Sequence, residues 1–461
     1  MKKFLILSLL AAITLSGALC KTVSQEVTNA SKPVQLTYWR VFDDSDAFSD
    51  IIAEYSKIHP NVSITYRKLT YGEFEQKLIQ ALAEDRGPDI FSIHNTWMNG
   101  YQTKLLHLPA SITLPYRTIQ GTIKKDVVWE MQTKKSLAIK DIKSQFADQV
   151  ASDVIIPEVD PKTGAAADKI FGLPLALDTL TLFYNKDLLN AAGLPEPAKD
   201  WQTLQDHVKK LTKQDAQGNI TQAGAALGSA NNIDRGTDVL SALMMQNGAE
   251  MTDDQDRATF NLVPETLAGR SMAPGIEALT FYTDFASPQK EVYTWNETLP
   301  NSIDAFIQGK VAYIFSYAYN LPAIKARAPK LNFGIAKLPQ ISGNKEVNFA
   351  NYWVEVVSKK TTHPNEAWDF VQFAADADMA QKYLDKTKKP TALRSLIQKQ
   401  SEDIDLFPFV SQVLTAKSWY HGKNALEAEQ AIKSMITSVI YGAKTAAEAI
   451  NLGVQKVNQT L

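Results

Sequence analysis

The sequence predicts an α/β protein with at least two domains. The chain has 461 residues, of which 45% are hydrophobic and 21% charged, a composition typical of globular proteins. One hydrophobic core rarely extends over such a length. Segment 34–38 (VQLTY) has the pattern of a strand, 47–58 that of a helix and 62–66 that of a second strand, with a loop expected at 39–46. This β-α-β order predicts a parallel sheet near the N-terminus.

The next helix and strand have clear boundary signals. Thr70 and Glu73 have the spacing of a capping box, an apolar face follows over 74–82, and the Gly-Pro pair at 87–88 ends the helix. A strand is expected at 89–93. The polar and aromatic residues that follow it would lie beyond the carboxyl end of a strand, where open α/β sheets bind their ligands.

The middle of the chain is less regular. Residues 110–165 are Lys-rich and weakly patterned, and they predict one helix near 139–154 and a loop at 157–164. Residues 180–184 predict a strand buried on both faces. Later segments predict a helix capped by Asp200, strands at 309–317 and 332–339, a helix that begins at Pro364, and a helical C-terminal third.

Charge is nearly balanced along this chain. The formal net charge is −2, and loss of Lys2 and Lys3 with an N-terminal segment would change it to −4 (−2 minus 2). Neither value provides the basic surface that nucleic acid or an anionic membrane surface attracts. We therefore expect no nucleic-acid partner, and a neutral ligand suits the chain better than an anionic one.

The N-terminus resembles a secretory signal. Residues 1–20 combine a basic start, a short apolar run and small residues, and the run is too short to cross a bilayer. Cys20 is the only cysteine and stands where bacterial lipoproteins carry their lipid-modified cysteine, although Leu19 precedes it in place of the usual Gly or Ala. The segment 16–18 also fits ordinary cleavage and secretion. Lipidation at Cys20 would leave 21–32 as a polar tether to the membrane.

Several segments together resemble one family, the extracellular solute-binding proteins that feed sugar ABC transporters. The resemblance covers nearly all of the chain after the signal and depends on the order and spacing of its segments. The segments are YWRVFDD, HPNVSITY, GPDIFSIHNTW, IFGLPLALDTLTLFYNKDLL, AFIQGKVAYIFSY, NFGIAKLPQ, VSKKTTHPNEAWDFVQFAA and GAKTAAEAI.

The resemblance implies a two-lobe periplasmic-binding-protein-like fold of type II, with discontinuous α/β lobes joined by a hinge. Lobe 1 would comprise 33–176 plus 340–402, and lobe 2 would comprise 177–339 plus 403–461. The protein would be a monomeric, extracytoplasmic substrate-binding component of an ABC importer, located on the outer face of the cytoplasmic membrane. It would capture a mono- or oligosaccharide by hinge closure and then dock on the permease subunits, without a cofactor or catalysis.

The maltose-binding branch of this family also implies positions for the ligand contacts. They are Trp39, Asp43, Asn95, Trp97, Asp178, Ser316, Tyr317, Tyr319 and Trp353. Carboxylates and amides pair with sugar hydroxyls, and aromatic rings cover the apolar faces of the sugar. Glu429 stands near the place of an aromatic residue in the maltose branch, and this departure argues against maltose itself.

Other interpretations of these residues remain open. The tryptophans are compatible with core positions, Asp43 with a turn and Asp178 with a helix-neighbouring carboxylate. Tyr317 and Tyr319 share one side of a strand, which is also compatible with iron binding, although the six histidines form no cluster in sequence. A phosphate ester would require basic groups, for which only Arg40 and Arg394 are candidates, and Arg394 fits a surface ion pair at least as well.

The remaining alternatives concern the class of protein. A polyamine, glycerol phosphate or ferric ion could replace the sugar, and an adhesin or sensor could use the same fold without a transporter. An enzyme is disfavoured because the sequence has no G-x-S-x-G, H-E-x-x-H or phosphate-loop motif. A pair such as Asp43 and Asp178 could in principle act as the acid and base of a glycosidase across a cleft.

Overall fold

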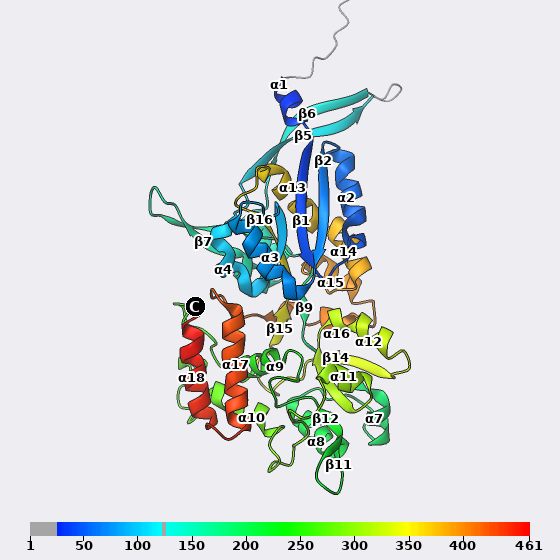
Figure 1. Cartoon of the computed structure of the whole chain (residues 1–461), viewed down its shortest axis with the longest axis vertical. Coiled ribbons are helices and arrows are strands. Elements are labelled where there is room, and N and C mark those ends of the chain that lie inside the picture. The colour runs from blue at the N-terminus through cyan, green and yellow to red at the C-terminus, as the bar shows by residue number, and fades with distance from the viewer. Residues whose placement is uncertain (1–24, 122–125) are drawn as a thin grey trace, which may run out of the picture.

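The computed structural model describes residues 25–121 and 126–461 and forms two lobes stacked along its long axis (Figure 1). The expected signal segment 1–20, with Cys20, lies outside the described residues. The end of the expected tether is described and forms a short helix, α1 (Gln25–Ala30), which contacts strands of lobe 1. Among the residues described, no helix is long and apolar enough to cross a bilayer.

Lobe 1 is built around a five-stranded mixed sheet with the order β2-β1-β3-β16-β4. β1 (Val34–Val41) is parallel to β2 (Val62–Leu69) and to β3 (Ile90–His94), which confirms the predicted parallel opening. β16 (Trp353–Ser358) returns from far along the chain and is antiparallel to β3 and to β4 (Leu105–Leu106). The helices of this lobe are α2 (Asp46–Ile58), α3 (Tyr71–Ala83), η1 (Asn95–Trp97), α4 (Met98–Tyr101), η2 (Gln102–Lys104), α5 (Ile139–Gln145), α6 (Asp148–Val154), α13 (Pro364–Ala375), α14 (Ala377–Thr387) and α15 (Arg394–Gln400).

The prediction that a loop begins at residue 39 is wrong. β1 continues through Val41 because its parallel pairing with β2 runs on to Leu69. Trp39 therefore lies in a strand, and the loop begins only at Phe42. The capping box of α3 is confirmed, with Thr70 as the N-cap and Glu73 at the third helical position.

The helix expected at 139–154 is two helices, α5 and α6. Between them Phe146 is extended and forms a β-bridge with Leu393, while the N–H of Ala147 donates to the carbonyl of Ala392 at 3.0 Å. Pairing with a distant segment thus interrupts a pattern that is locally helical.

The irregular region also contains two antiparallel ribbons that the pattern does not predict. β5 (Ser111–Gln120) pairs with β6 (Asp126–Lys135), and β7 (Ile155–Val159) pairs with β8 (Ala166–Ile170). Both ribbons project from lobe 1, and α1 packs on the first (Figure 1). The expected loop at 157–164 is the tip and part of one strand of the second ribbon.

Lobe 2 has a second five-stranded sheet with the order β11-β12-β13-β10-β14. β12 and β13 are parallel, whereas β10 is antiparallel to its neighbours β13 and β14. The strands are β10 (Thr181–Asn185), β11 (Lys213–Gln214), β12 (Ile220–Ala225), β13 (Val311–Ser316) and β14 (Phe333–Lys337). The helices are α7 (Lys186–Ala191), α8 (Trp201–Leu211), α9 (Gly236–Gln246), η3 (Glu265–Leu267), α10 (Pro274–Asp284), α11 (Ser302–Ile307), η4 (Ala318–Asn320), α12 (Leu321–Arg327), α16 (Phe407–Val410), α17 (Ala425–Ile440) and α18 (Ala446–Asn458).

Three short strands at the junction of the lobes pair with one another. They form a small sheet of β9 (Asp178–Thr179), β15 (Asn348–Asn351) and β17 (Ala416–Lys417), the last preceded by η5 (Val413–Thr415). β15 is antiparallel to β9 and parallel to β17. This sheet is the expected hinge, and it sits where the two lobes meet (Figure 1).

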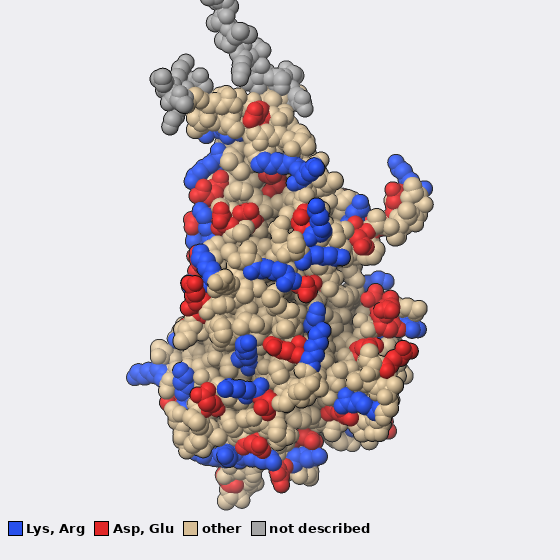
Figure 2. All heavy atoms as spheres, turned by 180° about the vertical axis from the view of Figure 1, so that it is seen from behind, with Lys and Arg blue, Asp and Glu red and all other residues tan. Residues whose placement is uncertain are grey.

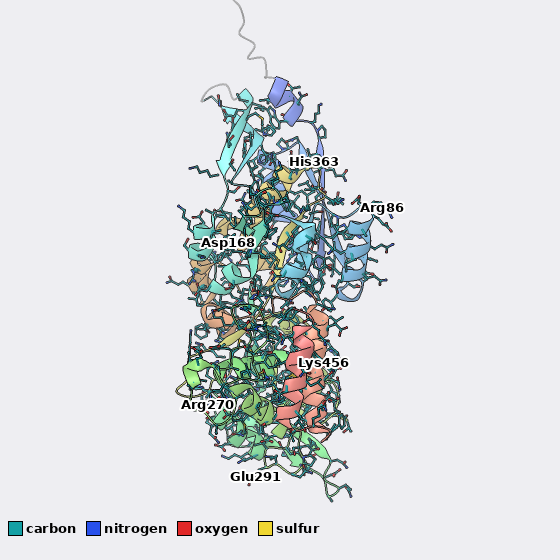
Figure 3. The ribbon with its side chains drawn as sticks, turned by 90° about the vertical axis from the view of Figure 1, so that its left-hand side faces the viewer. Arg86, Asp168, Arg270, Glu291, His363 and Lys456 are labelled. Carbon is teal, nitrogen blue, oxygen red and sulfur yellow. The ribbon has the colours of Figure 1, made fainter. Side chains whose placement is uncertain are left out.

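Charged side chains are spread over the outside of both lobes. Figure 2 shows basic and acidic groups interspersed over one face, without a large area of a single sign. Arg86 lies at the right-hand side of the upper lobe and Glu291 at the lower end of the side view, and their side chains are 77% and 85% exposed (Figure 3). On the face in view, this distribution agrees with the near-neutral net charge of the chain.

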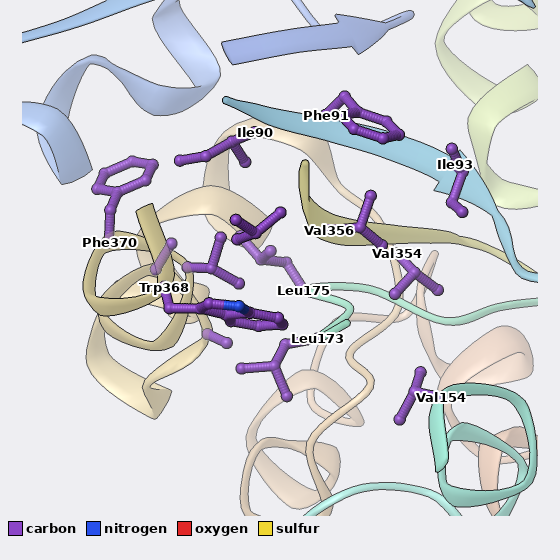
Figure 4. Packing of buried hydrophobic residues seen from close by; sticks show 14 of the residues in the cluster. Ile90, Phe91, Ile93, Val154, Leu173, Leu175, Val354, Val356, Trp368 and Phe370 are labelled. Atoms are coloured by element: carbon purple, nitrogen blue, oxygen red, sulfur yellow. The ribbon is translucent and has the colours of Figure 1, made fainter. Parts of the chain in front are cut away.

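Each lobe has its own hydrophobic core. In lobe 1 the side chain of Trp368 packs beside Leu173 and Leu175, near the valines of β16 (Figure 4). The lobe 2 cores include the buried strands β10 and β13 and the helices α9 and α17. Because the cores are separate, the cleft between the lobes can be shaped by loops and hinge residues alone.

Candidate functional site

A cavity of about 620 Å³ lies between the lobes. Ligand pockets in proteins typically measure about 300 to 1,000 Å³. Lobe 1, lobe 2 and the hinge all contribute to its walls. The residues that line it include Arg40, Phe42, Tyr71, Glu75, His94, Trp97, Asp178, Asp234, Arg235, Thr237, Asp238, Tyr319, Asn351, Tyr352, Trp353, Lys389, Ser418 and Glu429.

Aromatic rings form one wall of this cavity. Trp353 is at its centre, with its ring centroid 5.6 Å from that of Trp97 and 5.8 Å from that of Phe42. Phe42 stacks on Tyr71 of the same lobe and, at 6.5 Å, on Tyr319 of the other lobe. The exposed fractions of Phe42, Tyr71 and Tyr319 are 51%, 55% and 41%, so part of each side chain is accessible to an apolar surface.

The ends of strands place these rings. Phe42 directly follows β1 and adopts a φ of 71°, in the left-handed region that a bulky residue rarely occupies. Trp97 ends η1, whose first turn is capped by the His94 side chain, which accepts from the N–H of Thr96. Trp353 opens β16 opposite His94 of β3. The aromatic wall is thus positioned by the strand ends of lobe 1 that point toward lobe 2.

Asp178 lies in the hinge strand β9 and is 6% exposed. Its carboxylate accepts hydrogen bonds from the backbone N–H groups of Thr179, Ala318 and Tyr319 at 2.9, 3.1 and 3.2 Å. Burial raises the pKa of Asp178 to about 7, although these three hydrogen bonds and the charge of Lys389 act in the opposite direction. The residue therefore links the hinge to the turn that carries Tyr319.

A buried ionic network lies behind the lobe 1 wall. The guanidinium of Arg40 is 2.9 Å from Asp43 and 3.0 Å from Glu355, and the ammonium of Lys389 is 2.6 Å from Asp43. The hydroxyl of Tyr383 also donates to Asp43 at 2.8 Å. Burial raises the pKa of Asp43, but the charges of Arg40 and Lys389 outweigh burial and hold it below its usual value. Asp43 supports the cavity wall and is not among the lining residues.

The lobe 2 wall carries a second ionic cluster. Arg235, with a φ of 54°, precedes α9 and lies 2.7 Å from Asp238 and 3.4 Å from Glu429. Burial raises the pKa of Asp234, which accepts from Asn320 at 3.1 Å. The hydroxyl of Thr237 is buried and has no hydrogen-bond partner among the residues described. An unpaired buried hydroxyl in a cavity wall is available to a ligand.

Four of the nine expected ligand contacts line the cavity: Trp97, Asp178, Tyr319 and Trp353. Four others lie behind its walls. Asn95 donates to Asp153 and to Ser418, Ser316 accepts from Asn320, Tyr317 donates to Asp238, and Asp43 binds Arg40 and Lys389. Trp39 is outside the lining, in β1, with the guanidinium of Arg67 4.8 Å from the centre of its ring.

Two further candidates have other surroundings. Arg394 donates to the carbonyl of Phe146 and forms an ion pair with Asp148, away from the cavity lining. Tyr317 is fully buried, and the described part of the chain has no group of three or more His, Cys, Asp and Glu side chains that could hold a metal ion. Neither arrangement supports a phosphate or an iron site at the expected residues.

Several lining residues were not among the expected contacts. Phe42 follows strand β1, and Tyr71 follows the N-cap of helix α3, and the sequence pattern locates both elements. A large aromatic side chain at either position is a signal of a ligand contact that the sequence does contain. Arg235 and Thr237 follow a turn-rich segment, and nothing local distinguishes them from surface residues. For Glu429, which also lines the cavity, the sequence indicates only a departure from the maltose branch.

Comparison with known proteins identifies the family. The model of the bacterial extracellular solute-binding proteins matches residues 42–381, which is most of the chain. The chain belongs to this family. Among relatives, it is similar to a galactooligosaccharide-binding protein of Bacillus subtilis, with 23% identity over 401 residues that cover 86% of this chain and 82% of the relative.

Further members of the solute-binding family are similar as well. A maltooligosaccharide ABC transporter solute-binding lipoprotein of Streptococcus pneumoniae is 24% identical over 64% of this chain and 67% of its own length. The crystal structure of a cyclic alpha-maltosyl-1,6-maltose binding protein from Arthrobacter globiformis has a TM-score of 0.71 at 19% identity and covers 93% of this chain and 98% of its own. The structural likeness shows the two-lobe fold.

Proposed function

We propose that this protein captures a neutral carbohydrate between its lobes and delivers it to an ABC importer. The observation that carries the proposal is the combination, in one interlobe cavity, of partly exposed aromatic side chains with one buried and one half-buried carboxylate. The rings of Phe42, Tyr71 and Tyr319 match the C–H faces of sugar rings. Asp178 and Asp234 match the hydroxyl groups, which need acceptors once they are removed from water.

The distribution of charge favours a neutral sugar over a phosphate ester or an acidic sugar. Each of the three cations in the lining, Arg40, Arg235 and Lys389, has a carboxylate within 4 Å. By contrast, Glu75, Asp178 and Asp234 line the cavity without an ion-pair partner in the described part of the chain, and burial raises the pKa of all three. An anionic ligand would meet unpaired carboxylates and no free cation.

The relatives support an oligosaccharide. The names of the B. subtilis and S. pneumoniae relatives specify galactooligosaccharide and maltooligosaccharide, and the cavity of about 620 Å³ has room for more than one sugar ring. On this proposal the chain is secreted, lipidated at Cys20 and monomeric. The proposed lobe boundaries are near 176, 339 and 402, and the hinge strands lie at 178–179, 348–351 and 416–417.

Closure would follow from contacts that a ligand makes with both lobes. A sugar on Trp353 of lobe 1 also meets Tyr319 of lobe 2, so the closed arrangement offers more contact area than either lobe alone. The paired hinge strands keep the lobes aligned during this movement. The permease would then recognise the closed form.

Isothermal titration calorimetry with galactotriose, maltotriose, glucose 6-phosphate and spermidine tests the proposal. We expect saturable binding of at least one neutral sugar and none of the sugar phosphate. If spermidine were the only compound that bound, the ligand would be a cationic solute and not a sugar. The unpaired carboxylates would suit such a solute as well. Binding of glucose 6-phosphate in preference to the neutral sugars would overturn the charge argument.

A further inference from the structure

Asp153 lies outside the lining of the cavity and has an unusual set of partners. Its side chain is fully buried in α6 and accepts from four side chains. The amide of Asn95 is at 2.9 Å, the amide of Gln149 at 2.7 Å and the imidazole Nε2 of His421 at 2.8 Å, and the hydroxyl of Tyr352 also donates to it. All four donors thus converge on one carboxyl group, and hydrogen bonds of this charge-assisted kind are stronger than neutral ones.

The partners of Asp153 come from both sides of the cleft. Asn95 and Tyr352 belong to lobe 1, on η1 and just before β16. His421 belongs to the loop after β17, where Trp419 and Tyr420 pack in the lobe 2 core. The loop is fixed there because the Tyr420 hydroxyl donates to the carbonyl of Thr460 at 3.0 Å and accepts from the N–H of Asn424.

The same group also contacts the wall of the cavity. Tyr352 and Ser418 are lining residues. Tyr352 is held by Asp153 directly, and Ser418 accepts from the amide of Asn95 at 2.9 Å, which in turn is held by Asp153. One carboxylate therefore orients two cavity groups and an imidazole of the opposite lobe.

We propose that Asp153 is a positioning residue for solute capture, and that its ion pair with His421 is a latch that holds the lobes together. This inference rests on the proposed capture of solute by lobe closure. When the lobes separate, His421 leaves with lobe 2, and the buried Asp153 loses its only cationic partner among the described residues. The latch thus favours the closed form with or without solute.

The latch depends on protonation. Burial lowers the pKa of His421, but the hydrogen bond and charge of Asp153, with a smaller contribution from Asp256, raise it above its usual value. The other imidazole nearby, His94, has a pKa lowered to about 4 by burial and stays neutral between pH 5.5 and pH 8.5. The contribution of the ion pair is fully present below the ordinary pKa of about 6.5 and is lost as pH rises through the raised pKa.

Distance measurements between spin labels test this without a ligand. Cysteines introduced at the exposed positions Gln80 of α3 and Gln430 of α17, in the chain without Cys20, report the separation of the lobes. We expect the fraction of separated lobes to increase between pH 5.5 and pH 8.5, since the ion pair is lost as pH rises through the raised pKa of His421. The variant H421Q should lose this pH dependence.

Two variants separate a latch from a merely structural role. H421K keeps a cation at all of these pH values and should keep the lobes together at pH 8.5. D256N removes a neighbouring charge without touching the pair and should change the profile little. D153N, checked for folding by circular dichroism, should resemble H421Q. An unchanged separation in the wild type from pH 5.5 to 8.5, or the wild-type pH dependence in H421Q, would overturn the latch.

Titration with maltotriose adds a second readout. With H421Q the apparent Kd should increase at pH 5.5 and match the wild type at pH 8.5. If no sugar binds while the spin-label distances behave as expected, the proposed ligand fails and the latch stands. If sugar binds with the same pH dependence in both proteins, the latch fails and the proposed function stands.

Discussion

Replacement of Asp178 by Asn should remove a pH dependence from the stability of the whole chain. Burial raises the pKa of this hinge carboxyl from 3.8 to about 7. A carboxyl group whose pKa is higher in the folded state stabilises the fold fully below pH 3.8, and that stabilisation is lost as pH rises through about 7.

The size of the effect follows from the two pKa values. With 3.8 for the unfolded chain and about 7 for the folded chain, linkage gives about 2.7 kcal/mol of stabilisation at pH 5 and about 0.1 kcal/mol at pH 8. The wild type should therefore lose about 2.6 kcal/mol more than the Asp178→Asn variant between these two pH values. The Asn side chain cannot accept every hydrogen bond that Asp178 accepts, such as the one from the N–H of Tyr319. The stability lost in this way is the same at both pH values and cancels in the difference.

Urea unfolding, followed by tryptophan fluorescence at pH 5 and pH 8, measures this double difference. Asp168→Asn serves as the matched control, because Asp168 is an exposed residue of β8 at the outside of lobe 1 (Figure 3). The control should keep the wild-type difference between the two pH values. Equal differences in Asp178→Asn and the wild type would refute the assignment of a raised pKa to the hinge carboxyl.

Three further outcomes are expected. Trp353→Ala should weaken sugar binding at least about tenfold, because it removes the centre of the aromatic wall, whereas Trp39→Ala should leave calorimetric affinity unchanged. Lys389→Met should lower the free energy of unfolding by about 2 to 4 kcal/mol in denaturant titrations, since it removes one of the two cations that hold buried Asp43, and the double variant with Asp43→Asn should recover part of that loss. Phe42→Gly should relieve the left-handed backbone and raise the melting temperature while it weakens sugar binding, and a lower melting temperature would show that the ring's packing outweighs the backbone strain.

Much of the fold could be predicted from local patterns. The opening β-α-β unit, the capping box at Thr70 and the buried strand near 180–184 are signals that lie within a few residues of one another. The ribbons between 111 and 170 were missed because a Lys-rich, two-stranded ribbon shows weak alternation. The break at Phe146 was missed because its cause, the bridge to Leu393, is 247 residues away (393 minus 146).

The candidate site was predictable in part for the same reason. Trp97 and Trp353 follow or begin strands, and a strand end is visible in sequence. Asn95 has the same local signal, yet its amide turns to Asp153 and Ser418, which no local pattern reveals. Arg235 lines the cavity because α17 brings Glu429 against it, a contact between distant segments.

The pairing of β3 with β16 constrains the order in which the chain can fold. Trp353 lies opposite His94, so 259 residues (353 minus 94) must emerge before the first sheet obtains its fourth strand. Until then the apolar edge of β3 is open to wrong partners, and such edges invite aggregation. A newly exported molecule would thus benefit from a holding chaperone until its last third arrives, and C-terminal truncations short of Ser358 should yield insoluble protein rather than an isolated first lobe.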